Sequence, residues 1–158
     1  MCALTVGHEH HATLMPHVDA LARLAADLDL PQTAGLADRL AAEHRFVVDQ
    51  LVPHMERVER TVYPELERLM EDARSMAPLR REHEELRRLV GEMGGAVGRE
   101  LTLGERMRLR RVLYRMYGLL KVHLSEEEGY LRLLDRSRSE AEEAEFRRAM
   151  EHATTERV

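Results

Sequence analysis

The sequence contains no tryptophan and a single cysteine, Cys2, and aromatic residues make up only 4% of its 158 residues. One cysteine excludes a disulfide bond within the chain and is typical of a reducing compartment, so we expect a cytoplasmic protein. Because aromatic side chains are scarce, the core must be built from leucine, valine, alanine and the nine methionines. A chain of this length is most simply one domain with a substantial core.

The chain also has no apolar run as long as the ~18–20 residues of a membrane span, and its N-terminus lacks the apolar core of a signal peptide. Its net charge of −5 gives no reason to expect a nucleic acid or an anionic membrane as a partner. No stretch alternates apolar and polar residues for long enough to predict a strand. Charged residues, by contrast, make up 34% of the chain, and its abundant Ala, Leu, Glu and Arg favour helices.

Apolar residues recur at helical spacing in four long segments of the chain. We expect helices at about residues 5–29, 33–72, 78–93 and 102–135. Within the second segment, Pro53 and Pro64 each remove a backbone donor and should kink or interrupt the helix. Four long helices with short connections predict an all-α fold, an up-down antiparallel four-helix bundle.

The bundle should occupy residues 1–136, followed by a charged C-terminal helix or tail at residues 137–158. Gly94-Gly95 should end the third helix. Two sequences have the form of a capping box: residues 102–105 (Thr-Leu-Gly-Glu) at the start of the fourth helix, and residues 139–142 (Ser-Glu-Ala-Glu) at the start of a short tail helix. The tail has little apolar surface, and the sequence leaves open whether it binds a protein partner.

Four histidines recur in two matching halves of the chain. In the first half His17 is followed by His54, and in the second half His83 is followed by His123. An acidic cluster comes directly after each second histidine: Met-Glu-Arg-Val-Glu after His54, and Leu-Ser-Glu-Glu-Glu after His123. Histidines and carboxylates repeated in this way on long helices are the side chains from which metal sites inside helical bundles are built.

The strongest pair is His123 and Glu127, because residues four apart lie about 40° apart around a helix and share a face. The rest of that face is apolar, so both side chains should point into the core. A buried carboxylate is costly unless it is paired or coordinated to a metal. Imidazole and carboxylate suit iron, and also zinc, manganese or nickel. The expected metal ligands are therefore His17, His54, His83, His123 and Glu127.

These residues and their order resemble a known family. The similarity lies in the segment 51–66, which contains His54 and a Tyr-Pro pair, in Arg-Glu-His-Glu-Glu-Leu around His83, and in Val-His-Leu-Ser-Glu-Glu-Glu around His123. Over roughly residues 8–135 the chain is similar to hemerythrin-like domains, the HHE cation-binding family. This resemblance implies a four-helix bundle with a non-haem di-iron site, in which Glu127 bridges the two irons.

One position departs from the family's pattern. The family's second-helix motif has a bridging Glu four residues after the histidine, where this chain has Val58. Some members use an acid five residues after the histidine, which makes Glu59 a candidate ligand, although an ideal helix places it about 140° from His54. The other candidates for the missing ligand are Tyr130, His10 and His11. The site then holds two irons, as the family implies, or only one.

The resemblance implies a protein that binds or senses O2, NO or peroxide, or that handles iron. The sequence shows no nucleophile–base pair and no substrate-sized polar pocket, so a conventional enzyme is not favoured and any chemistry would be the metal's own. Two alternatives stay open: a helical interaction module whose metal site has decayed, and a bundle that holds a structural zinc ion.

Overall fold

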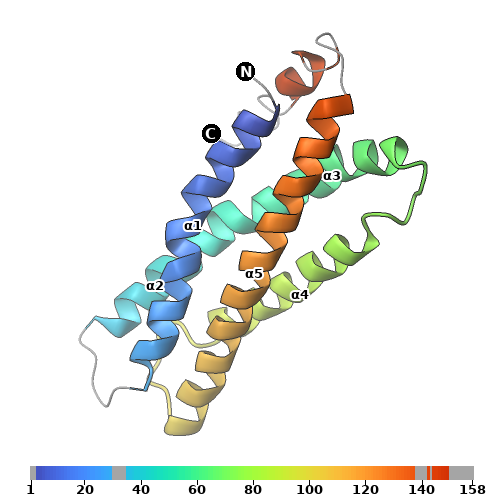
Figure 1. The fold of residues 1–158 in the computed structure, drawn as a ribbon. Coiled ribbons are helices and arrows are strands. Elements are labelled where there is room, and N and C mark those ends of the chain that lie inside the picture. The colour runs from blue at the N-terminus through green and yellow to red at the C-terminus, as the bar shows by residue number, and fades with distance from the viewer. Residues whose placement is uncertain (1–2, 30–34, 138–141, 143, 150–158) are drawn as a thin grey trace.

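The computed structural model describes residues 3–29, 35–137, 142 and 144–149, with side chains described from His11 onward. The elements are α1 (Ala3–Asp27), α2 (Leu36–Phe46), the π-helix η1 (Val47–Leu51), α3 (Val52–Leu69), α4 (Ala77–Gly94) and α5 (Leu103–Ser137). They form an elongated helical bundle in which α1 and α5 lie side by side (Figure 1). Within these described ranges there is no strand, so the prediction of an all-α protein is confirmed.

The second predicted helix, residues 33–72, is divided into three elements near Pro53. The elements α2, η1 and α3 follow one another without a break, and η1 ends two residues before Pro53. Pro53 has no backbone N–H to donate to the i→i−4 ladder, and the π-helical turn lies just before it in the chain. Pro64 lies inside α3 and Pro16 inside α1, and both helices continue past them.

The predicted helix boundaries in the second half are also found. The third helix, α4, ends at Gly94, and α5 begins at Leu103, directly after Thr102, the first residue of the predicted capping box. The Thr102 amide donates to Glu105 Oε2 at 2.8 Å, and the Glu105 amide donates to Thr102 Oγ1 at 3.3 Å. The second capping box, at residues 139–142, lies largely outside the described residues. Of the tail, residues 144–149 are helical, and Phe146 packs against the core.

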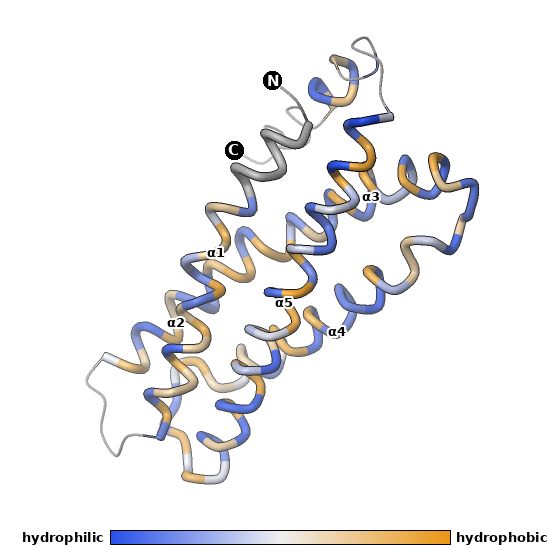
Figure 2. Tube along the Cα trace, in the orientation of Figure 1, coloured by the Kyte–Doolittle hydropathy of each residue, from blue (hydrophilic) through white to orange (hydrophobic). Residues whose placement is uncertain are grey.

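The core is aliphatic and rich in methionine, as the composition predicts. Four methionines are completely buried: Met55, Met76, Met93 and Met116. Figure 2 shows hydrophobic and hydrophilic residues alternating along α5, which places one stripe of this helix against its neighbours and leaves the other exposed. No helix in the described part of the chain combines the length and the hydrophobicity needed to span a membrane.

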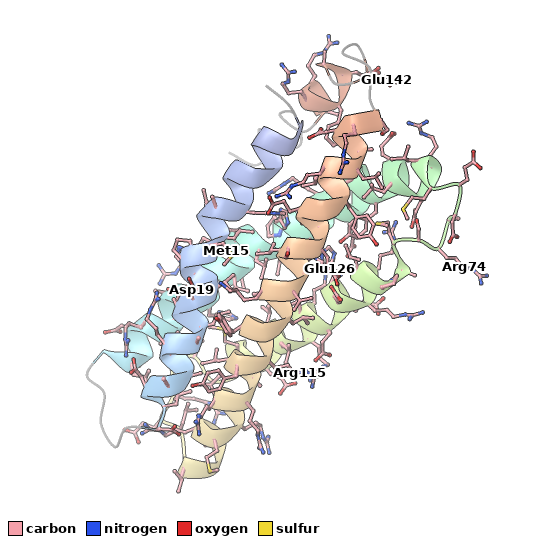
Figure 3. The ribbon with its side chains drawn as sticks, in the orientation of Figure 1. Met15, Asp19, Arg74, Arg115, Glu126 and Glu142 are labelled. Carbon is pink, nitrogen blue, oxygen red and sulfur yellow. The ribbon has the colours of Figure 1, made fainter. Side chains whose placement is uncertain are left out.

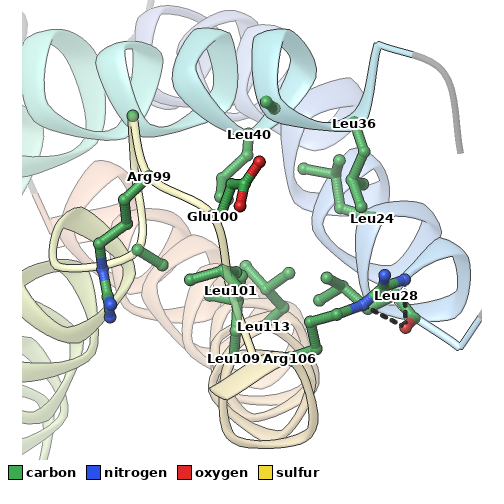
Figure 4. Close-up of a pocket in the computed structure, with 13 residues that line it drawn as sticks. Leu24, Leu28, Leu36, Leu40, Arg99, Glu100, Leu101, Arg106, Leu109 and Leu113 are labelled. Carbon is green, nitrogen blue, oxygen red and sulfur yellow. Dashed lines mark hydrogen bonds between the residues drawn. The ribbon is translucent and has the colours of Figure 1, made fainter. Parts of the chain in front are cut away.

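An apolar cavity lies at the end of the bundle where α1 ends and α5 begins. Its volume is about 490 Å³, and its walls come from α1, α2, the α4–α5 loop and α5 (Figure 4). Seven leucines line it: Leu24, Leu28, Leu36, Leu40, Leu101, Leu109 and Leu113. At its edge the Arg106 guanidinium donates two hydrogen bonds to the Leu28 carbonyl, at 2.9 and 3.2 Å.

Candidate metal centre

Five polar side chains are buried in the opposite half of the bundle. They are His11 on α1, His54 on α3, His83 on α4, and His123 and Glu127 on α5. None is more than 5% exposed, and Glu127 and His83 are completely buried. Burying so many polar groups is costly unless they satisfy one another or hold a ligand, so this cluster requires a functional or a structural reason. Figure 3 labels Glu126, the exposed residue next to Glu127 in the sequence, and this label marks the part of α5 where the cluster lies.

The Glu127 carboxylate lies at the middle of the cluster. Its Oε2 is 3.0 Å from the Nε2 of His11 and also 3.0 Å from the Nε2 of His54. Its Oε1 accepts a hydrogen bond from the Tyr63 hydroxyl at 3.2 Å and lies 3.7 Å from His123 Nε2. One carboxylate therefore faces histidines from both sides, with one oxygen directed to each side.

The cluster divides into two groups that share Glu127. The α1–α3 half-site consists of His11, His54 and Glu127, and the α4–α5 half-site consists of His83, His123 and Glu127. In each, the potential ligand atoms lie within 4.8 Å of one another, which is close enough to surround one metal ion. The Nε2 atoms of His83 and His123 are only 2.8 Å apart, so the inner nitrogens of the two rings face each other.

Each histidine of the α4–α5 half-site has a carboxylate beside its Nδ1 atom, the outer nitrogen of the ring. Glu59 Oε1 lies 2.7 Å from His83 Nδ1, and Glu82 Oε2 lies 2.7 Å from His123 Nδ1. Arg87 in turn donates a 3.0 Å hydrogen bond to Glu59. A carboxylate that accepts the Nδ1 proton fixes the tautomer and the orientation of the ring, and leaves Nε2 free to bind a cation.

The charges around Glu127 favour its ionised form. Burial alone would raise the pKa of Glu127, but the charge of His54 and hydrogen bonds from His11 and His123 hold that pKa well below its ordinary value. Burial and the adjacent Glu127 raise the pKa of Tyr63, which therefore keeps its proton. The centre thus contains a buried anion beside a phenol that can only donate a proton or a hydrogen bond.

The pKa values of the two histidines of the α4–α5 half-site are shifted in opposite directions. Burial and the neighbouring His123 lower the pKa of His83 to about 4, so His83 is neutral at neutral pH. Burial also disfavours the charged form of His123, but its hydrogen bonds to Glu127 and Glu82 outweigh this effect and raise the pKa of His123. A neutral imidazole and an ionised carboxylate are the forms that coordinate metals.

Three of the four predicted histidines meet in this cluster, and the fourth does not. His17 Nδ1 instead lies 2.7 Å from Glu43 on α2, and its ring stacks on Phe46 with the centroids 3.4 Å apart. Its side chain is 38% exposed. The position expected for His17 is occupied by His11, which the sequence offered only as an alternative. The side chain of His10 lies outside the described residues.

The remaining candidates for the missing ligand are also placed elsewhere. Glu59 contacts the outer nitrogen of His83 rather than the centre, and Tyr130 packs against the apolar cluster of Leu131 and Leu134. Val58 is buried in that same apolar cluster. The metal-ligand roles predicted from the sequence stay predictions, but the structure does define which side chains are close enough to share an ion.

The sequence named His11 only as a candidate for the missing ligand, and it assigned no role to Tyr63. His11 precedes the buried Leu14 by three residues and Val18 by seven, and this spacing indicates that it shares their buried face. Tyr63 donates toward Glu127 and lies 3.3 Å from His83 Nε2, but no histidine or carboxylate spacing singles it out. In the sequence, Tyr63 stood out only as part of the Tyr-Pro pair, and that pair indicated no role for its hydroxyl.

Comparison with known families agrees with this geometry. The model of the hemerythrin HHE cation-binding domain matches residues 3–134, which is most of the chain, and the protein therefore belongs to this family. Neither a curated protein nor a solved structure matches the sequence. The buried imidazoles and the central carboxylate are the donor set that a cation-binding domain needs, and they suit iron, zinc or manganese.

Proposed function

We propose that this protein is an up-down four-helix bundle that binds non-haem iron between its helices and presents that iron to O2, NO or peroxide. The observation that carries the proposal is the Glu127 carboxylate. It is completely buried, it is ionised, and its two oxygens face two different groups of histidine nitrogens. A bridging carboxylate between two pairs of imidazoles is the arrangement expected of a site for two cations.

Different residues of the chain have different roles in such a site. Four imidazoles and Glu127 hold the cations, and iron bound there would supply the redox chemistry that captures a small diatomic molecule or peroxide. The Tyr63 hydroxyl, protonated and directed at Glu127 and His83, offers a hydrogen bond at the centre. The leucine and methionine core around the cluster keeps bulk water away from it.

The two alternatives make different predictions. A decayed metal site should leave its histidines apart or bonded only to backbone groups, whereas four rings here converge on one carboxylate, which favours a working site. A structural zinc site is favoured by the same donor set, since imidazole and carboxylate also bind zinc. The two metals differ in colour and in reactivity with oxygen.

The decisive experiment is metal analysis combined with an optical spectrum. The purified protein, stripped of metal, is loaded with Fe(II) without air, desalted and analysed for iron, and its spectrum is recorded before and after exposure to air. We expect one to two irons per chain and a charge-transfer band that appears in air. Glu127→Gln should lose most of the iron, while Glu126→Gln, which changes the exposed neighbour, should retain it.

Three outcomes would count against the proposal. If the wild-type protein retains no iron, or if Glu127→Gln retains as much as wild type, the centre is not an iron site. If the protein as purified is colourless, contains zinc and does not exchange it for iron, the structural zinc alternative is correct.

A further inference from the structure

The two half-sites are not supported equally by their surroundings. In the α4–α5 half-site, both histidines have an outer carboxylate on Nδ1, Glu59 for His83 and Glu82 for His123, each at 2.7 Å. In the α1–α3 half-site, the Nδ1 atom of His11 is buried and has no hydrogen-bond partner among the side chains that the structure describes. Among these side chains, the ring of His11 contacts Glu127 and the ring of His54, and no outer carboxylate fixes its tautomer.

This difference affects both the geometry and the charge at the two positions. An outer carboxylate fixes which ring nitrogen carries the proton and increases the basicity of the other, and losing one typically weakens metal binding about 10–100-fold. Glu59 and Glu82 also place negative charge near the α4–α5 half-site, and Glu59 shares its charge with the guanidinium of Arg87. The remaining negative charge attracts a divalent ion to that position.

The hydrogen bonding around the ligands differs in the same direction. The Tyr63 hydroxyl donates to Glu127 Oε1 and lies 3.3 Å from His83 Nε2, so it helps to position two of the three ligands of the α4–α5 half-site. The carboxylate that the family's motif would add after His54 is replaced by Val58, a buried apolar residue on the same helix, α3. Without that bridging carboxylate, both half-sites share Glu127, and the α1–α3 half-site has no described outer carboxylate on His11 to compensate for the loss.

We propose that the two cations bind in a fixed order, first at His83, His123 and Glu127, and then, more weakly, at His11, His54 and Glu127, with Glu82 and Glu59 as the positioning residues that set this order. The proposal rests on the proposed metal-binding function. It adds that the centre combines a high-affinity cation site with a lower-affinity site whose ion exchanges more easily. A single ion then occupies the α4–α5 half-site when metal is limiting.

The order is tested by calorimetric titration of the metal-free protein with Zn²⁺, which binds imidazole and carboxylate without redox chemistry. We expect two binding steps whose dissociation constants differ at least tenfold. His11→Ala should abolish the weaker step and leave the tighter one within about threefold. His83→Ala should abolish the tighter step.

The role of the outer carboxylates is tested by variants that conserve shape. Glu82→Gln should weaken the tighter step about 10-fold or more and leave the weaker step nearly unchanged. Glu84→Gln, on the exposed face of the same helix, is the matched control and should change neither step. Far-UV circular dichroism of each variant checks that the helices are intact.

The possible failures are distinguishable. If wild-type protein binds no Zn²⁺ and no Fe(II), the proposed function itself fails. If it binds two ions with equal affinity, or if His11→Ala abolishes the tighter step, metal binding stands and the order proposed here is wrong. If Glu82→Gln and Glu84→Gln behave alike, Glu82 does not position His123.

Discussion

One half of the bundle contains five buried polar side chains that contact one another around Glu127, and the other half contains a cavity of about 490 Å³ lined mainly by leucine. In the polar half each group depends on particular partners at distances near 3 Å, so a single substitution leaves a buried donor or acceptor without one. In the apolar half the contacts are non-directional and some space remains unfilled. We infer that the first half determines function and the second contributes mainly stability.

The largest change in stability is expected in the apolar half. Leu113 is completely buried and lines the cavity, so Leu113→Ala should enlarge the cavity and lower the free energy of unfolding by about 3 kcal/mol. Leu103→Ala, at a position that is 76% exposed, should change it by less than about 0.5 kcal/mol. Urea unfolding measures both values. The metal content of Leu113→Ala should stay at the wild-type level, and a loss of metal would contradict the separation of the two halves.

In the polar half, Val58→Glu should have opposite effects with and without metal. Without metal, the new carboxylate is buried among apolar side chains and should lower the free energy of unfolding by about 2 kcal/mol. With metal, the carboxylate can coordinate, so the stability should recover and the metal content should rise. Thermal unfolding with and without a chelator measures this. An equal loss in both conditions would mean that position 58 does not face the site.

A smaller effect is expected where α2 and α4 approach each other. A Cβ atom at Gly94 would lie 2.7 Å from His44 Nε2, so Gly94→Ala should force the His44 ring to move and should destabilise the protein by about 1 kcal/mol. Gly91→Ala, on the same helix but with no atom within 4 Å, should instead stabilise it by about 0.5 kcal/mol, because alanine favours the helix. The same sign for both substitutions in chemical unfolding would show that this contact does not limit packing.

The smallest expected effect is a change in pH dependence at the start of α5. Hydrogen bonds from the Thr102 amide and hydroxyl and from Arg99 lower the pKa of Glu105 from its ordinary value of 4.5 to about 2. Because the folded state favours the ionised form, the capping box stabilises the protein above pH 4.5, and this contribution is lost as the pH falls toward 2. Glu105→Gln should therefore lower the melting temperature at pH 6 more than at pH 2.5. Glu100→Gln, in the preceding loop, should show no such difference between the two pH values.

The periodicity of the sequence predicted the helices because each one presents a continuous apolar face, and the capping box at Thr102 marked a boundary through local hydrogen bonds. The four residues His54, His83, His123 and Glu127 were predicted for a similar reason. His123 and Glu127 are four residues apart on one helix, so their common face follows from helical geometry alone.

The location of His17 outside the cluster has a different origin. His11 and His17 are both on α1, and six residues separate them by about 9 Å along the helix axis. Sequence spacing shows which side of a helix faces inward, but it does not show which level of α1 lies opposite His54 and Glu127. That level depends on how far α1 slides along α5, and the packing of the leucines between them sets it.

The amino-acid sequence therefore specified the helical class, the aliphatic core and the chemistry of the buried donors, because these depend on composition and on contacts within single helices. Tertiary packing decided that His11 rather than His17 lies beside Glu127, that Tyr63 reaches Glu127, and that Glu59 and Glu82 support one half-site from outside. These contacts join residues between 24 and 116 positions apart, and such distances are closed only when the helices pack against one another.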